Sequence, residues 1–274
     1  MIPQGTPTIV LVSSANDPAS KNLAREMIEN RGFASTRIAF RGRPLYQKDS
    51  LLLTMVDEEI IRPPDLDAYF NPQAYIFLSK HRAKSGVPSL TAHTTGNFGE
   101  AELGGNPKEL ARTNPDLLKN YMISLSKRRE RVPKYQITLE ATHHGPTSLQ
   151  KPVLFVELGS EEQNWGDEEA AKVMMEALLE SLNEPRFWEK VGIGLGGTHY
   201  PEKFTKLLIE DELALASIAP RYSLELIDAM VFGQMLQKST KSVKYAVLDW
   251  KGLGDQKDKI VGLVRQFGLE EIRV

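Results

Sequence analysis

The chain has no cysteine, little net charge and no long apolar run, and each shortage excludes a class of function. Without cysteine there are no disulfides, thiolate metal sites or cysteine nucleophiles, so a metal would need histidines and carboxylates. The net charge of −2 provides no overall basic field, and we expect no DNA partner. No run of about 18 apolar residues is present, so no membrane span is expected. The N-terminus lacks the basic and apolar regions of a signal peptide, which predicts a cytoplasmic protein.

Strand-like and helix-like segments alternate along the 274 residues, which predicts an α/β protein. Several strand-like segments are apolar on both faces, which is typical of a central sheet covered by helices on both sides. No linker or internal repeat divides the chain, so we expect a single α/β domain (1–274) with the loop-rich stretch 96–115 as an elaboration. Polar residues near the ends of strands are expected at a functional rim of the sheet. Strands are expected at 7–15, 74–81, 88–97, 134–142, 151–160, 190–197 and 244–252, and helices at 21–32, 114–130, 166–183, 223–239 and 258–268.

The histidines lie at the ends of strand-like runs. A packed histidine is the commoner case for any one of them, but recurrence at four strand ends predicts a shared polar site with histidine as base or metal ligand. Successive side chains of a strand point to opposite faces, so His143 and His144 cannot both face one point while the strand stays regular. The Gly145-Pro146 turn could rotate His144 back toward the site, and at least one of the pair should reach it. The other histidines are His81, His93 and His199.

Two glutamates interrupt apolar segments near these histidines. Glu157 lies within VLFVEL, where a carboxylate is costly unless it has a partner. It could bind a metal, hold a histidine tautomer or act as a general base, and the alternative is a buried ion pair with Arg or Lys. Glu140 precedes His143 by three residues, so it is expected to face the side opposite to His143.

Two glycine-containing segments lie beside histidines. Gly96 and Asn97 follow His93, and glycine allows close backbone approach and free N–H groups for an anion, which favours a binding loop over a flexible surface loop. The segment GIGLGG does not match a dinucleotide fingerprint and does not open a helix, so no nicotinamide cofactor is expected. Gly196 and Gly197 are instead expected to let a ligand approach the histidine that follows.

No G-x-S-x-G elbow and no H-E-x-x-H helix is present, which removes the commonest hydrolase and zinc-protease templates. A histidine- and carboxylate-lined site without a covalent nucleophile suits direct attack by water on a carbonyl or phosphoryl centre.

One segment, 126–135, is strongly basic. It is either a solvated helix end, where Lys and Arg suit the helix dipole, or a local phosphate-binding patch. Its basic residues are Lys127, Arg128, Arg129, Arg131 and Lys134.

Four blocks of the sequence together carry a family resemblance: LTAHTTGNFGEAELGG, LEATHHGPT, FVELGSEEQNW and GLGGTHY, in this order. They resemble the archaeal-type D-aminoacyl-tRNA deacylases, shared with plants, over essentially the full chain. The resemblance implies hydrolysis of the ester joining a D-amino acid to the terminal ribose of tRNA. It also implies a mixed sheet between helices, similar to nucleoside phosphorylases and peptidyl-tRNA hydrolases, and suggests zinc as a cofactor.

The resemblance implies one of two ways of activating the attacking water. Either a bound zinc ion activates it, or a neutral histidine acts as the base while glycine N–H groups hold the oxyanion. D-aminoacyl-tRNA is the expected partner, and a homo-oligomer is possible. The alternatives are a nucleoside phosphorylase-like or amidohydrolase-like enzyme on a small molecule, and a tRNA-binding protein without catalysis. The expected catalytic residues are His93, His143, His144, His199 and Glu157, of which all but His144 are also the expected metal ligands. The expected substrate-binding residues are Thr142, Asn97, Gly96, Gly196 and Gly197, with Lys127, Arg128, Arg129, Arg131 and Lys134 on the acceptor stem.

Overall fold

The computed structural model describes residues 9–274. Its strands are β1 (Ile9–Ser14), β2 (Ala34–Phe40), β3 (Arg43–Lys48), β4 (Leu51–Val56), β5 (Ala74–Lys80), β6 (Ser89–His93), β7 (Gln136–Leu139), β8 (Val153–Gly159), β9 (Lys190–Leu195), β10 (Leu213–Ala219), β11 (Tyr245–Leu248) and β12 (Glu270–Arg273). Its helices are α1 (Pro18–Asn30), α2 (Pro115–Ser126), α3 (Glu162–Trp165), α4 (Glu168–Asn183), α5 (Glu202–Glu210), α6 (Ala229–Gln237) and α7 (Lys257–Gln266), with the 3-10 helices η1 (Arg129–Arg131), η2 (Arg221–Leu226) and η3 (Gly254–Gln256).

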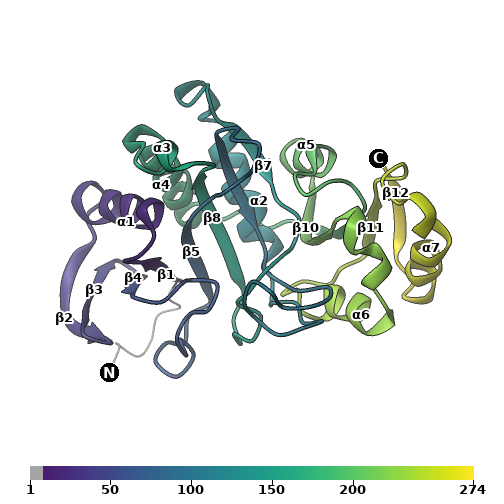
Figure 1. Ribbon diagram of the computed structural model, residues 1–274, viewed down its shortest axis with the longest axis horizontal. Coiled ribbons are helices and arrows are strands. Elements are labelled where there is room, and N and C mark those ends of the chain that lie inside the picture. The colour runs from purple at the N-terminus through teal and green to yellow at the C-terminus, as the bar shows by residue number, and fades with distance from the viewer. Residues whose placement is uncertain (1–8) are drawn as a thin grey trace.

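The strands form two sheets that lie side by side along the long axis of the molecule (Figure 1). The first is a mixed sheet of eight strands in the order β2-β3-β4-β1-β5-β8-β6-β7, and the second is a parallel sheet of four strands in the order β10-β9-β11-β12. The expected α/β class with a mixed central sheet and flanking helices is confirmed. The second sheet was not predicted, because β10 and β12 gave no strand signal that was recognised.

Several element boundaries differ from the sequence expectations, among them the end of β7 at Leu139 in place of residue 142. The expected strand at 7–15 is β1, and residues 7 and 8 lie outside the described part of the chain. Strands β2 and β3 were missed because their half-exposed hairpin lacks a continuous apolar run, whereas β4 was missed although its residues, LLLTMV, form such a run. The helix expected at 223–239 is divided, because Asp228 accepts a hydrogen bond from the backbone N–H of Val231 (2.9 Å) and so begins α6.

The continuous apolar runs of the first sheet are explained by two separate cores, one on each face. Along β8, Leu154, Val156 and Leu158 pack in the core that α1, α2 and α4 cover, whereas Val153 and Phe155 pack on the opposite face. That second face is covered by side chains of non-helical segments, among them Ile60, Leu66, Phe70 and Leu149. Alternation therefore places Glu157 on the face without helices, together with Ser79 of β5 and Thr91 and His93 of β6.

The direction of β6 and β7 decides where the polar residues meet. β6 runs antiparallel to β8 and parallel to β7, whereas β5 runs parallel to β8. The carboxyl ends of β5 and β8 therefore lie at the edge opposite to those of β6 and β7. The expectation of one shared rim is wrong, and the polar side chains meet over the face of the sheet.

The second sheet has helices on both faces. Phe204 and Leu208 of α5 pack in the core shared with α2, and the residues of α6 and α7 pack on the other face. Within residues 9–274, no helix combines the length and the apolar character needed to cross a bilayer.

A fully buried lysine on α2 joins the first sheet's helical layer to the second sheet. The Lys119 ammonium donates hydrogen bonds to the carbonyls of Leu208, Asp211 and Leu213, at the end of α5 and the start of β10. The same ammonium lies 4.3 Å from the centroid of the Trp188 ring. Burial lowers the pKa of Lys119 to about 8. The lysine thus donates hydrogen bonds to backbone carbonyls. If a hydrophobic residue replaced Lys119, these carbonyls would lose that donor.

We expect the substitution Lys119→Met to reduce the free energy of unfolding by about 3 kcal/mol, because buried carbonyls would lose charged donors. Urea unfolding followed by circular dichroism measures the change. Lys172→Met, at an exposed position of α4, is the matched control and should leave the midpoint unchanged. Equal midpoints for the two variants would contradict this role of Lys119.

Candidate active site

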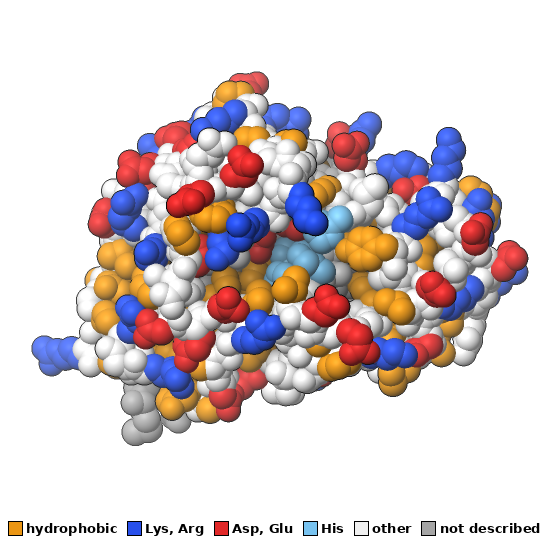
Figure 2. All heavy atoms as spheres, in the orientation of Figure 1, with side chains coloured by type: hydrophobic (Ala, Val, Ile, Leu, Met, Phe, Trp, Pro, Cys, Tyr) orange, Lys and Arg blue, Asp and Glu red, His pale blue; other side chains and the backbone are white. Residues whose placement is uncertain are grey.

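A cavity of about 510 Å³ lies on the face of the first sheet that carries no helices. Figure 2 shows the histidines gathered at its mouth, in the middle of this face of the molecule. The chain segments that line it come from the ends of β1 and β5, from the loops 59–61 and 139–144, and from the loop after β9. The lining residues with ionisable side chains are Asp17, Glu59, Lys80, His81, Arg82, Glu140, His143, His144, Glu157 and His199.

Both members of the adjacent histidine pair reach this cluster. The ring centroids of His143 and His144 lie 4.2 and 4.8 Å from that of His93, and His143 lies 4.6 Å from His199. β7 ends at Leu139, so the alternation rule no longer governs the pair. His144 has a positive φ of 44°, and this left-handed backbone turns its side chain back toward its neighbour. The turn alternative is therefore confirmed for His144.

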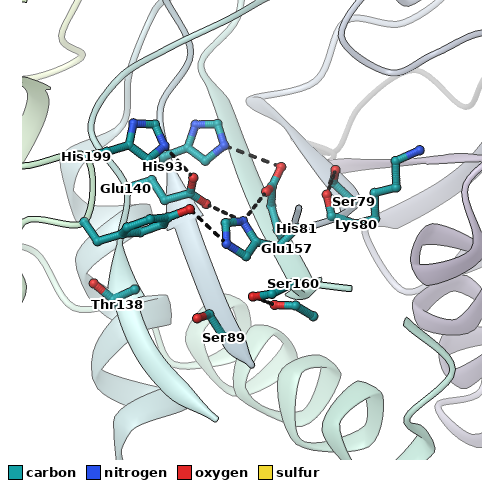
Figure 3. Close-up of polar contacts among 12 residues, drawn as sticks. Ser79, Lys80, His81, Ser89, His93, Thr138, Glu140, Glu157, Ser160 and His199 are labelled. Atoms are coloured by element: carbon teal, nitrogen blue, oxygen red, sulfur yellow. Dashed lines mark hydrogen bonds and ion pairs between the residues drawn. The ribbon is translucent and has the colours of Figure 1, made fainter. Parts of the chain in front are cut away.

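Glu140 lies at the centre of the cluster (Figure 3). One carboxylate oxygen, Oε2, lies 3.0 Å from His199 Nε2 and 3.8 Å from His143 Nε2. The other, Oε1, lies 3.2 Å from His81 Nδ1. The expectation that Glu140 faces away from His143 is wrong, because the chain leaves the sheet after β7. The signal for Glu140 was the one used for Glu157, a carboxylate within an apolar segment.

Glu157 pairs with two histidines, and the alternative of a buried pair with Arg or Lys is not found among the described residues. Its Oε2 lies 3.4 Å from His81 Nδ1 and its Oε1 lies 3.5 Å from His93 Nε2. His81 thus bridges both glutamates (Figure 3), and its Nε2 lies 3.2 Å from the hydroxyl of Tyr200. Sequence reasoning noted His81 at a strand end but did not include it among the site residues.

The four groups of this network hold each other in their charged forms. Burial by itself would lower the pKa of His81, but its hydrogen bonds to Glu140 and Glu157 outweigh burial and raise that pKa to about 10. The pKa of His93 is also raised, since its contact with Glu157 outweighs burial. Burial opposes ionisation of both glutamates, but bonds from the histidines hold their pKa values below the usual range. The imidazolium of His81, together with the raised pKa of His93, therefore places positive charge beside two buried carboxylates.

His143 and His144 have the opposite character. Burial, with the positive charge of His93 nearby, lowers the pKa of His143 well below 6.5 and that of His144 to about 4. Both rings are therefore neutral at pH 7. The Nδ1–H of His143 donates to the carbonyl of Ala141 (2.8 Å), and that of His144 donates to the carbonyl of Gly145 (2.6 Å). Each Nε2 is left with a free lone pair.

Among residues 9–274, three sets of side chains have ligand atoms close enough together to hold one metal ion. Only the set of Glu140, His143 and His199 combines a carboxylate with two partly exposed histidines, whose side chains are 24% and 30% exposed. Of the expected ligand set, the structure brings His143 and His199 to Glu140, whereas His93 and Glu157 face one another in the buried network. The other two sets are His93 with His143 and His144, and His81 with Glu140 and Glu157.

Five of the ten expected substrate-binding residues, those predicted near the histidines, are not part of the cavity lining. They hold the histidine-bearing segments in place. The backbone N–H of Gly96 donates to the carbonyl of His144 (2.8 Å), and the Asn97 side chain donates to the carbonyl of Gly104 (2.8 Å). The hydroxyl of Thr142 bonds that of Thr94 (2.9 Å). Gly196 and Gly197 bond the backbone of Ala219 and Arg221, at 2.9 Å each.

The basic segment 126–135 lies before β7, whereas the site follows β7, so the structure does not bring this segment to the histidines. Four of its five basic side chains pair with acids, and Arg129 bonds the carbonyl of Ser126. These ion pairs with acids of α4 and its N-cap favour the alternative of a solvated helix end over a phosphate-binding patch. The pairs are Lys127 with Glu180, Arg128 with Glu176 and Glu180, Arg131 with Glu169 and Glu176, and Lys134 with Asp167.

Comparison with known proteins gives one family. Residues 68–272 match the family model described as D-aminoacyl-tRNA deacylase. The D-aminoacyl-tRNA deacylase of Cenarchaeum symbiosum is 37% identical, with 96% of this chain and 98% of that protein covered. That of Pyrococcus furiosus is 33% identical, with 96% and 99% covered. A crystal structure of a conserved protein of unknown function superposes with a TM-score of 0.90 at 30% identity, covering 97% of this chain and 95% of that one.

We expect the histidines to titrate in two separate groups in chelator-treated protein. Since the folded-state pKa of His81 is raised to about 10, its ring should stay protonated at pH 8, and its contribution to stability should be lost as the pH rises from 6.5 toward 10. Since the pKa of His144 is lowered to about 4, its ring should stay neutral at pH 5.5, and its contribution should be lost as the pH falls from 6.5 toward 4. Histidine ring 15N shifts measure both states.

His81→Gln and His144→Gln assign the two resonances in that titration. Ordinary titration of both rings near pH 6.5 would contradict the charged network.

Proposed function

This chain belongs to the D-aminoacyl-tRNA deacylase family, and we propose that it hydrolyses the ester between a D-amino acid and the terminal ribose of tRNA. The oxygen of water bonds to the ester carbonyl carbon, the bond from that carbon to the ribose oxygen breaks, and the proton lost by water ends on the ribose oxygen. The products are free D-amino acid and uncharged tRNA. The observation that carries the proposal is the meeting of His143, His144 and His199 with the buried Glu140 in one cavity.

Glu140, His143 and His199 fit a catalytic zinc site. A carboxylate with two imidazoles and an open position toward solvent is a donor set of known catalytic zinc sites. The other nitrogen of each ring has a partner, since His143 Nδ1 bonds the Ala141 carbonyl and His199 Nδ1 lies 2.9 Å from the Tyr222 hydroxyl. Such partners orient metal-binding rings. Zinc bound there would lower the pKa of its water to about 7 and polarise the ester carbonyl.

His144 is proposed to transfer the proton. Its Nε2 has a free lone pair and its ring lines the cavity, so it can accept the proton of the attacking water. A pKa of about 4 makes the neutral ring a weak base, but makes the imidazolium an effective acid toward the departing ribose oxygen. His144 therefore suits the second half of the transfer better than the first.

His81, His93 and Glu157 act through Glu140 as positioning residues. Glu140 is buried, but hydrogen bonds from His199 and His81 and the charge of His93 keep it ionised, while Glu157 holds His81 and His93 in place. An ionised Glu140 holds His199 and attracts a cation, whereas a protonated one would do neither. The buried residues of the network therefore set the charge and the position of Glu140, on which the partly exposed His143 and His199 depend.

We expect the purified protein to release D-tyrosine from D-Tyr-tRNA much faster than L-tyrosine from the matched L-Tyr-tRNA. Treatment with a chelator should abolish release, and added zinc should restore it. Equal hydrolysis of the two esters would contradict chiral selection, and no release from either would contradict the proposed function. Activity that survives chelation would remove zinc from the mechanism and leave the hydrolysis in place.

We expect Glu140→Gln and His143→Ala to lower kcat by about 100-fold or more, because each removes a group that holds or activates the water. The affinity for tRNA, measured by filter binding, should change little, since phosphate contacts dominate it. Glu29→Gln, an exposed carboxylate of α1, is the matched control. A parallel loss of tRNA binding would instead indicate a binding or folding role for the cluster.

A further inference from the structure

Three large hydrophobic side chains are exposed in one short segment of the chain, which reaches the site at Tyr222. Tyr222, Leu226 and Met230 are 64%, 47% and 60% exposed and follow one another from η2 into α6. Figure 2 shows hydrophobic side chains directly beside the histidines, on the side where Figure 1 places β10, β11 and α6. A gathering of this kind on an otherwise polar surface marks an interaction site.

Tyr222 ties this surface to the reacting groups. Its hydroxyl lies 2.9 Å from His199 Nδ1, and the two ring centroids lie 6.3 Å apart with an angle of 24° between the ring planes. His199 in turn bonds Glu140. The hydroxyl end of the tyrosine is therefore fixed by the site, while much of the residue remains open to solvent.

The substrate places a nucleobase at this distance. In an aminoacyl-tRNA, the ester and the terminal adenine belong to one nucleotide and are separated only by its ribose. With the ester carbonyl at the histidines, the adenine lies one sugar ring away. An exposed aromatic face is the surface on which proteins stack unpaired bases of RNA.

Charge and the lining of the cavity agree with this orientation. Arg221, next to Tyr222, is exposed, lies against Gly254 and has no ion pair among the described residues, so it can meet a phosphate of the RNA end. The cavity itself is lined by Ile60, Ile61 and Leu103, which suit the side chain of an amino acid, whereas Tyr222 and Arg221 lie outside its lining. The aminoacyl part and the RNA end thus have separate places.

We propose that Tyr222, Leu226 and Met230 form a stacking platform for the terminal adenine of aminoacyl-tRNA, with Tyr222 as the base-contacting residue. The inference rests on the proposed function, since it places the nucleic-acid part of that substrate. Tyr222 has two separable roles: its hydroxyl orients His199, and its ring receives the base.

The test compares Tyr222→Phe, which keeps the ring and loses the bond to His199, with Tyr222→Ala, which loses both. The substrates are D-Tyr-tRNA and D-tyrosine ethyl ester, which has no base. On the tRNA, the KM of Tyr222→Ala should exceed that of Tyr222→Phe about tenfold, the lower part of the range for loss of one stacked base. On the ethyl ester, the two variants should have the same kcat/KM. Inhibition by the trinucleotide CpCpA should weaken by a similar factor in Tyr222→Ala only.

Phe187→Ala is the matched control, because Phe187 is 82% exposed and precedes β9, whereas His199 follows it. Its KM for D-Tyr-tRNA should equal that of the wild type. Equal KM values for Tyr222→Ala and Tyr222→Phe on the tRNA would overturn the platform while the wild type still deacylates. If Tyr222→Ala changes the mass measured by light scattering and leaves the inhibition by CpCpA unaltered, the surface binds a second copy of the chain, and this result would also overturn the platform. Failure of the wild type on D-Tyr-tRNA would instead reject the proposed function.

Discussion

Two glutamates buried among histidines set the properties of the whole site. Glu140 and Glu157 lie in an interior that penalises charge, and each is kept ionised by imidazolium partners. His81 touches both, so the network can lose no member without leaving an uncompensated charge. Burial lowers the pKa of the neighbouring His143 and His144, and the positive charge of His93 lowers it further, so both remain neutral. Histidines that contact the buried glutamates closely are thus charged more readily than those that burial alone dominates.

The fold brings these groups together by placing chemistry on the face of a sheet that helices do not cover. Helices α1, α2 and α4 occupy one face of the first sheet, and loops cover the other. A loop-covered face can leave a cavity, whereas a helix-covered face is filled with interlocking side chains. The loop after β9 of the second sheet completes the cavity by contributing His199, which bonds Tyr222 outside the cavity lining. Lys119 fixes the end of α5 and the start of β10 to α2.

In the proposed hydrolysis, the buried and the exposed residues of the cluster have different tasks. The buried side supplies a fixed electrostatic environment, and such preorganised charge is usually the largest contribution to catalysis. The exposed side supplies lone pairs and an open position for water. An activated ester needs little more than a placed water, a polarised carbonyl and a proton for the leaving ribose oxygen. This explains how the chain, which lacks a cysteine and a recognisable serine elbow, can belong to a family of hydrolases.

The sequence by itself determined the α/β class, the approximate position of most strands and the meeting of histidines with a buried acid, because apolar periodicity and polar residues in apolar runs are local signals. It did not determine that Glu140 joins the histidine pair, because that depends on β7 ending at Leu139 and on the backbone of His144. It also did not reveal that His81 bridges the two glutamates. Nor did it reveal that basic residues of the segment 126–135, such as Lys127 and Lys134, pair with acids far away in the sequence. Those results depend on the antiparallel direction of β6 and on contacts between residues far apart in the chain, which only the tertiary structure decides.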